Sequence, residues 1–119
     1  MLLQNLLEAS EKALEDKFIF GACASFAIAL QQEIGGEFYA MVYKDDPYHI
    51  FIKKDGKNYD VKGKRNLPAM ALSMVGSYDM ENWKVEGPFT ADKMPCKKPT
   101  PKNIELAKSF IASHKNRFN

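Results

Sequence analysis

The sequence is poor in three features that often reveal a protein's setting. It holds two cysteines, too few for the disulfide framework of a small secreted domain. No run of apolar residues approaches the ~20 residues that cross a bilayer as a helix, so we expect no membrane partner. The formal net charge is only +2. That value argues against a dedicated nucleic-acid binder, because such proteins usually carry a strong basic bias.

The first residues also lack the features of a signal peptide. Residues 1–8 contain no basic residue, and Gln4 and Asn5 interrupt the leucines. We therefore expect a cytoplasmic protein in which Cys23 and Cys96 stay reduced. What the chain does hold is enough apolar material for one core: 119 residues, 45% hydrophobic, with eight Phe, five Tyr and one Trp. A single domain over residues 1–119 is the expectation.

Apolar spacing and turn residues predict two helices, then an antiparallel sheet, then a closing helix. The predicted helices cover residues 2–16, 22–34, 67–75 and about 101–115, and the predicted strands cover residues 37–44, 48–54, 58–62 and 82–86. The predicted connections are residues 18–21, the turns Asp45-Asp46-Pro47 and Asp55-Gly56, and the cap Asn66. This order is typical of an α+β fold, with the Cys23 helix packed on the sheet.

The Asp55-Gly56 turn brings candidate catalytic side chains together. A two-residue turn of this composition matches the twist of a β-hairpin. In the resulting register three pairs face one another: Lys54 with Lys57, Phe51 with Asp60, and His49 with Lys62. Strand alternation then places His49 and Asp60 on one face as diagonal neighbours, ~7–8 Å apart at the backbone. A hydrogen bond from the imidazole to the carboxylate is therefore expected.

Cys23 falls in the first turn of a predicted helix. The positive end of the helix dipole lowers the pKa of a thiol there and favours the nucleophilic thiolate. A nearby histidine lowers that pKa further, and backbone N–H groups at the helix start are suited to bind an oxyanion. The sequence therefore predicts a nucleophile, a base and an acid that orients the base in Cys23, His49 and Asp60.

Residues 18–63 resemble the papain-like superfamily of cysteine enzymes, in its transglutaminase-like and small bacterial or phage-encoded branches. The resemblance lies in Gly21-Ala22-Cys23-Ala24-Ser25-Phe26-Ala27, in His49-Ile50-Phe51-Ile52 and in Asp55-Gly56-Lys57-Asn58-Tyr59-Asp60. It implies a papain-like core in which Cys23 is the nucleophile, His49 the general base and acid, and Asp60 the residue that orients His49. The chain lacks the Trp that follows the nucleophile in papain itself and the Gln that precedes it, so a second oxyanion donor stays unassigned.

The resemblance implies a thiol-dependent hydrolase or acyltransferase that acts on an amide bond of a protein or peptide, as a peptidase, amidase, deamidase or transglutaminase. Phe51, Lys62 and Trp83 are candidates for the substrate side. The basic residues after the third strand form either a solvated turn or a patch that borders the site and favours an acidic substrate: Lys62, Lys64 and Arg65. The alternative is a catalytically silent binding module, an inhibitor or adaptor that recognises a protein partner. A toxin-like effector domain is a third interpretation.

Other features of the sequence have plainer interpretations. Asp45, Asp46 and His49 match no metal-ligand spacing, and no glycine-rich phosphate loop is present, so no cofactor is predicted. Residues 93–102 form a basic, proline-rich connector that is either a solvated loop or a site for an acidic partner. Cys96 lies in this connector with no nameable partner. His114 is expected at the surface.

Overall fold

The computed structural model describes the backbone of residues 2–76 and 81–119 and confirms the α+β class. The α-helices are α1 (Leu2–Phe20), α2 (Cys23–Ile34), α3 (Leu67–Val75) and α4 (Pro101–Ser113). The strands are β1 (Glu37–Tyr43), β2 (Asp46–Lys54), β3 (Lys57–Asp60), β4 (Gly63–Lys64) and β5 (Trp83–Phe89). Short 3₁₀ helices follow at Ala91–Lys93 and Lys115–Phe118. Among the described helices, none is long and apolar enough to cross a membrane.

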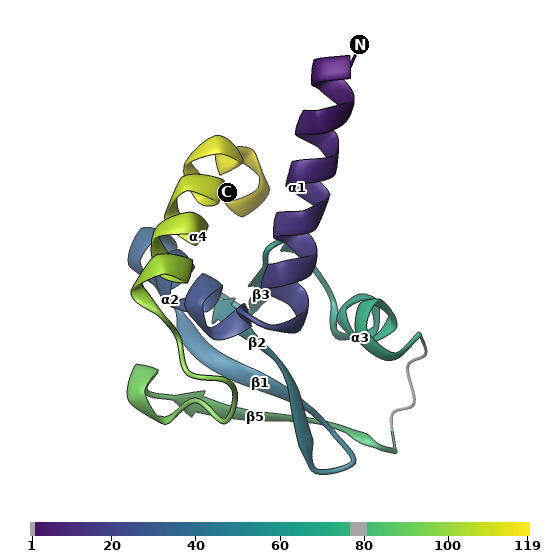
Figure 1. The fold of residues 1–119 in the computed structure, drawn as a ribbon. Helices are drawn as coiled ribbons and strands as arrows, with labels where there is room; N and C mark the ends of the chain where they lie inside the picture. The colour runs from purple at the N-terminus through teal and green to yellow at the C-terminus, as the bar shows by residue number, and fades with distance from the viewer. Residues whose placement is uncertain (1, 77–80) are drawn as a thin grey trace.

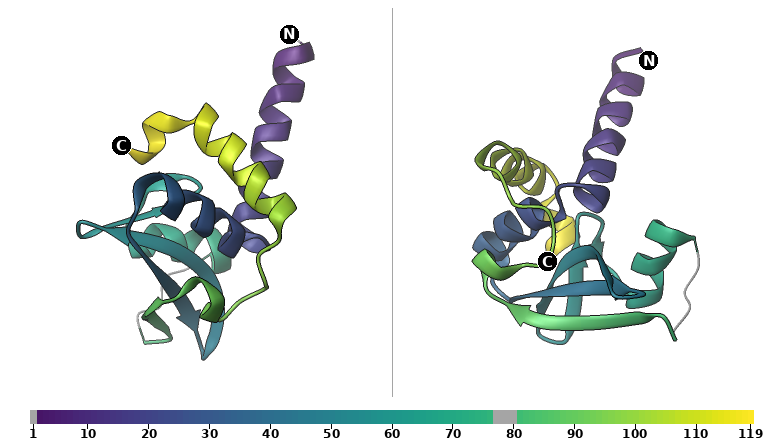
Figure 2. Two further views of the ribbon diagram at one scale, coloured as in Figure 1. Left: turned by 90° about the vertical axis from the view of Figure 1, so that its left-hand side faces the viewer. Right: turned by 60° about the horizontal axis from the view of Figure 1, so that its bottom comes forward.

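The strands form one antiparallel sheet in the order β4-β3-β2-β1-β5, with helices on both faces (Figure 1). A larger core cluster joins one face to α2, α4 and the end of α1, and it includes Ile50 and Ile52. A smaller cluster joins the other face to α3, and it includes Phe51. Strand alternation therefore splits β2 between two cores, as its continuous apolar run requires. The N-terminal end of α1 projects from this body in all three views, while its C-terminal end packs in the larger cluster (Figure 2).

Several predicted boundaries were wrong, each for an identifiable reason. Residues 18–20 continue α1 instead of forming a connector, because nothing breaks the helix before Gly21 and Phe18 is buried in the core. The first turn is at Lys44-Asp45, and Pro47 belongs to β2, where the beginning of a strand tolerates proline. The edge strand β5 continues past residue 86 through Gly87-Pro88 for the same reason.

The Asp55-Gly56 hairpin has the predicted register over its first three pairs: Lys54 with Lys57, Lys53 with Asn58, and Ile52 with Tyr59. Asp55 and Gly56 both have positive φ, 52° and 76°, as a type I′ turn requires. The third strand ends earlier than predicted, at Asp60, where the chain reverses into β4. Lys62 therefore lies in a turn, and the predicted pairing of His49 with Lys62 in the ladder was wrong.

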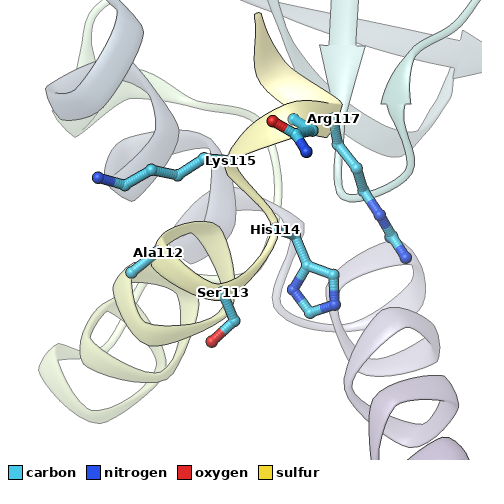
Figure 3. Close-up of a pocket in the computed structure, with 6 residues that line it drawn as sticks. Ala112, Ser113, His114, Lys115 and Arg117 are labelled. Atoms are coloured by element: carbon cyan, nitrogen blue, oxygen red, sulfur yellow. The ribbon is translucent and has the colours of Figure 1, made fainter.

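Helices α3 and α4 begin at capping side chains. Asn66, as predicted, accepts a hydrogen bond from the N–H of Ala69 at 2.9 Å, and Thr100 accepts one from Asn103 at 3.2 Å. Helix α4 ends two residues earlier than predicted, and the 3₁₀ turn after it curves back. The turn encloses a hollow of about 450 Å³ lined by residues 112–117 (Figure 3).

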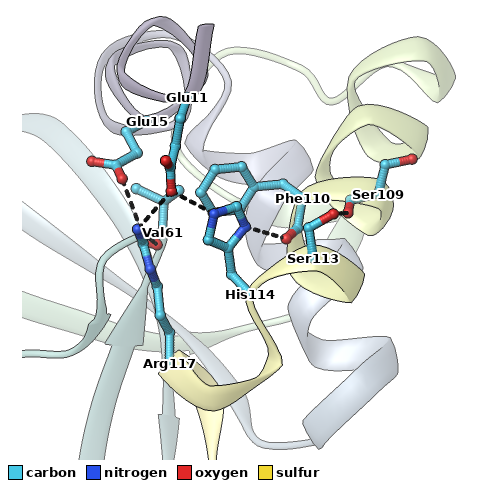
Figure 4. Close-up of polar contacts among 8 residues, drawn as sticks. All are labelled: Glu11, Glu15, Val61, Ser109, Phe110, Ser113, His114 and Arg117. Atoms are coloured by element: carbon cyan, nitrogen blue, oxygen red, sulfur yellow. Dashed lines mark hydrogen bonds and ion pairs between the residues drawn. The ribbon is translucent and has the colours of Figure 1, made fainter. Parts of the chain in front are cut away.

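The C-terminal turn fastens α1 to the sheet through Arg117. Its guanidinium donates hydrogen bonds to Glu15 at 2.9 Å, to Glu11 at 3.0 Å and to the carbonyl of Val61 at 3.2 Å (Figure 4). His114 donates a further bond to Glu11, so it is a half-buried link between helices and not the free surface residue that we predicted. The hydrogen bond from Arg117 to Val61 thus also fixes the turn that follows Asp60.

Gly36, between α2 and β1, has a conformation and a packing position that exclude a side chain. Its φ is +95°, and a Cβ there would lie 2.7 Å from Cγ2 of Ile52 and 2.9 Å from the carbonyl oxygen of Lys53. We expect Gly36→Ala to lower the free energy of unfolding by about 2–4 kcal/mol, because strain and overlap add. Urea denaturation measures this change.

Gly56→Ala is the matched control for Gly36→Ala. Gly56 also has a positive φ, +76°, but a Cβ added there would meet nothing within 4 Å. Its substitution should cost about 1–2 kcal/mol, the strain of a left-handed residue alone. Equal losses in the two variants would show that Gly36 is not closely packed against β2.

Candidate active site

Cys23 is the first residue of α2 and lies in its first turn, as predicted, although the helix begins one residue later than the predicted residue 22. The N–H groups of Gly21 and Ala22 both donate to the carbonyl of Lys17, at 3.0 and 2.9 Å, which ends α1 and turns the chain into α2. The N-cap position of α2 is Ala22, and no side chain caps this end. The Cys23 side chain is 7% exposed, so the thiol sits at a helix start, close to the surface of the core.

His49 and Asp60 form a buried hydrogen-bonded pair, as predicted. Nε2 of His49 lies 3.0 Å from Oδ2 of Asp60, and the two residues are 1% and 2% exposed. The strands β2 and β3 hold both side chains on one side of the hairpin. This bond occupies Nε2 and leaves Nδ1 as the ring nitrogen available to another group.

Asp60 has two further cationic or N–H partners that stabilise its charge. The backbone N–H of Lys62 donates to Oδ1 at 2.9 Å, and Nε of Arg65 lies 3.5 Å from Oδ2. Burial opposes ionisation, but the hydrogen bond to His49, the charges of His49 and Arg65, and the Lys62 N–H together lower the pKa of Asp60. Asp60 is therefore an ionised carboxylate at neutral pH.

Cys23 and His49 act on each other's ionisation. Burial opposes protonation of His49, but hydrogen bonds and charges from Asp60 and Cys23 outweigh it and raise the pKa of His49 to about 9. His49 in turn lowers the pKa of Cys23 by hydrogen bonding and by charge, and the N–H of Ile50 adds a smaller effect. Nδ1 of His49 has no hydrogen-bond partner among the described residues, so it is the ring nitrogen left for the thiol or for a bound group.

Cys96 is the unforeseen member of the site. The side chain of Cys96 is the largest single cause that lowers the pKa of Cys23 to about 4, against the opposing effect of burial. The same contact raises the pKa of Cys96, so Cys96 stays a neutral thiol beside a thiolate. At neutral pH the site therefore holds a Cys23 thiolate, a His49 imidazolium and an Asp60 carboxylate.

The remaining predicted site residues lie in different surroundings. Phe51 and Trp83 are buried in the cluster beneath α3, at 1% and 8% exposure, while the Lys62 side chain is exposed. Arg65, assigned only to a basic patch, is instead a mostly buried partner of Asp60. No signal in the sequence places Cys96 beside Cys23, because 72 residues separate them. Among the described residues, no group of three or more His, Cys, Asp or Glu could hold a metal ion.

Comparison of the chain with protein-family models, with curated proteins and with solved structures finds no match. The chemistry of the site therefore rests on the geometry of its own side chains. That geometry provides a thiolate nucleophile, a proton donor and a carboxylate that fixes the donor's orientation.

The ionisation of Cys23 provides a direct test of this geometry. We expect the ultraviolet absorbance of the thiolate to persist as pH falls and to disappear with a midpoint near pH 4, whereas an ordinary thiol protonates near pH ~8.5. His49→Ala removes the facing cation, so the midpoint should rise. Circular dichroism at each pH separates thiolate protonation from acid unfolding.

A pair of Cys96 variants separates the contributions to that midpoint. Cys96→Ser keeps a hydrogen-bond donor near Cys23 and Cys96→Ala removes it, so only the alanine variant should raise the midpoint substantially. Both variants also remove the second thiol from the absorbance signal. A wild-type midpoint near pH 8.5, unchanged by His49→Ala, would identify Cys23 as a structural thiol.

Proposed function

We propose that this protein is a small thiol-dependent acyl-transfer enzyme that acts on amide bonds of a protein or peptide. The observation that carries the proposal is the buried His49–Asp60 hydrogen bond of 3.0 Å beside a Cys23 thiol at a helix start. The resemblance of residues 18–63 to papain-like cysteine enzymes supports the same roles and a papain-like core. The two free thiols fit a reducing, cytoplasmic setting.

In the proposed reaction the Cys23 thiolate attacks the amide carbonyl carbon and forms a tetrahedral oxyanion. His49, protonated below about pH 9, gives its proton to the leaving amine as the C–N bond breaks and a thioester forms. Neutral His49 then takes a proton from water, which attacks the thioester and releases the acid and the Cys23 thiolate. An amine in place of water gives transamidation, and access of the acceptor decides between the two.

The start of α2 supplies an oxyanion site in this proposal. Helices α3 and α4 have side-chain caps on their first N–H groups, but α2 has Ala22 at the equivalent position and no such cap. Its first N–H groups, that of Cys23 included, are therefore free of a competing side-chain acceptor. Helix-start N–H groups stabilise negative charge both as donors and through the helix dipole.

A second candidate function is a binding module that has the fold but no turnover. The low exposure of Cys23, 7%, favours it, because a macromolecular substrate does not reach such a thiol without movement of the chain around it. The hollow at the C-terminal turn does not give a substrate access to Cys23, since residues 112–117 line it and none belongs to the triad.

Acylation by an activated ester distinguishes the two candidates. With p-nitrophenyl acetate we expect an acetyl group on Cys23 in intact-mass and peptide analysis, and its release by water or an added amine. Asp60→Asn should slow acylation by about 10²–10⁴-fold, because the neutral amide no longer stabilises the imidazolium or fixes its tautomer.

The pH dependence and a matched variant complete the test. The acylation rate should fall below about pH 4, where Cys23 becomes protonated, and turnover of an amide should fall above about pH 9, where His49 loses the proton that the leaving amine needs. Cys96→Ser should still acylate at Cys23. Absence of an adduct on Cys23 in the folded protein, with labelling only after unfolding, would favour the binding module.

A further inference from the structure

Cys23 has a second thiol near it, and nothing in the proposed acyl transfer uses it. The Cys96 side chain packs against the core cluster that contains Cys23, and each thiol shifts the pKa of the other. Both cysteines are free. A thiolate and a thiol in contact are the starting arrangement for a reversible disulfide.

The connector around Cys96 runs between the 3₁₀ helix that ends at Lys93 and the start of α4, and a hydrogen bond fixes its C-terminal end. The N–H of Thr100 donates to Oγ of Ser25 at 3.2 Å, which ties the end of the connector to the first turn of α2. Between Lys93 and Thr100 the chain has no helix or strand, and the Cys96 thiol lies 3.8 Å from the carbonyl oxygen of Lys97. Cys96 is thus placed near Cys23 by a segment in which no helix or strand hydrogen bonds would have to break for an S–S bond to form.

We propose that Cys23 and Cys96 form a peroxide-reactive dithiol, in which Cys23 is the attacking cysteine and Cys96 the resolving one. The inference shares one premise with the proposed function, namely that Cys23 is a reactive thiolate. It adds a second reactivity, with hydroperoxides as the substrate class, and a reversible off-state for the triad. A hydroperoxide as small as hydrogen peroxide also suits a thiol that is 7% exposed, because it needs less movement of the surrounding chain than a protein or peptide substrate does.

The chemistry balances in two steps. The Cys23 thiolate attacks one oxygen of hydrogen peroxide, the O–O bond breaks, and Cys23 becomes a sulfenic acid while hydroxide leaves and takes up a proton as water. Cys96 then attacks the Cys23 sulfur, the S–O bond breaks, and a second water leaves as the disulfide forms. Two thiols are oxidised by two electrons, and one peroxide is reduced to two waters.

The charge of Cys23 sets the order of these steps. While Cys23 is a thiolate it holds Cys96 protonated and therefore unreactive, because a second negative charge beside it is unfavourable. Once Cys23 is a neutral sulfenic acid this repulsion is gone and Cys96 ionises more readily. Cys23 therefore reacts first, and Cys96 becomes a nucleophile when it is needed.

The experiment treats the reduced full chain with one equivalent of hydrogen peroxide at pH 7 and follows free thiols and intact mass. The wild type should lose both free thiols, keep the mass of a single chain without reductant, and yield a peptide that links Cys23 to Cys96, reversible by dithiothreitol. Cys96→Ser should stop at a Cys23 sulfenic acid that dimedone traps. Cys23→Ser should leave Cys96 unoxidised at the same peroxide dose, with circular dichroism confirming its fold.

Alkylation of Cys23 by iodoacetamide in Cys96→Ser separates the two ways of failing. Rapid alkylation below pH 7, together with wild-type oxidation that leaves Cys96 free, would overturn the dithiol and leave the proposed acyl transfer standing. Slow alkylation in the folded variant would overturn the shared premise and both proposals with it. Oxidation that links Cys96 of one molecule to Cys96 of another would also overturn the intramolecular bridge.

Discussion

The buried ion pair of His49 and Asp60 is the constraint around which the rest of the structure is arranged. Taking two charged side chains out of water is unfavourable by several kcal/mol per ion unless each finds charged or hydrogen-bonding partners. Asp60 meets that requirement through hydrogen bonds with Nε2 of His49 and the N–H of Lys62 and through an ion pair with the guanidinium of Arg65. Each partner depends on a particular strand or turn. The conformations of β2, β3 and the following turn therefore all help to stabilise the negative charge of Asp60.

The C-terminal turn also helps to position the groups that stabilise Asp60. Arg117 donates to the carbonyl of Val61, the residue after Asp60, and its backbone carbonyl lies 2.7 Å from where a Cβ on Gly63 would be. The same guanidinium binds Glu11 and Glu15 on α1 (Figure 4). The N- and C-terminal helices therefore support the turn that presents the Lys62 N–H to the carboxylate. In this short chain, side-chain hydrogen bonds of Arg117 stabilise the turn, a role that additional strands could have in a larger domain.

How far the sequence predicts this site depends on the range of each interaction. The His49–Asp60 pair was predictable, because a two-residue turn fixes the register of a hairpin and alternation fixes which side chains share a face. The start of α2 at Cys23 was predictable too, since Gly21 breaks the preceding helix. Both inferences use contacts within about a dozen residues of sequence.

The contacts that escaped prediction join segments far apart in the chain. Cys96 reaches Cys23 only because β5 returns to the sheet edge beside β1 and because Thr100 is then fastened to Ser25, and neither event leaves a mark in the intervening sequence. Arg65 looks like a surface residue by type, yet the reversal at β4 brings it to Asp60. The type of a residue and its neighbours in sequence do not reveal which distant segment it contacts in the folded chain.

In the proposed acyl transfer, the Cys23 thiolate depends on the groups that remain beside the sulfur when a substrate enters. Cys96 is the largest cause of the low pKa of Cys23, and we expect a substrate carbonyl at the sulfur to displace it. Once Cys96 leaves, the cation of His49 and the N–H of Ile50 alone favour the thiolate. Hydrogen bonds and charges from Asp60 and Cys23 keep His49 protonated, and Asp60 stays ionised through His49, Arg65 and the N–H of Lys62. In the proposed reaction, the buried carboxylate therefore still supports the Cys23 thiolate through His49 after Cys96 is displaced.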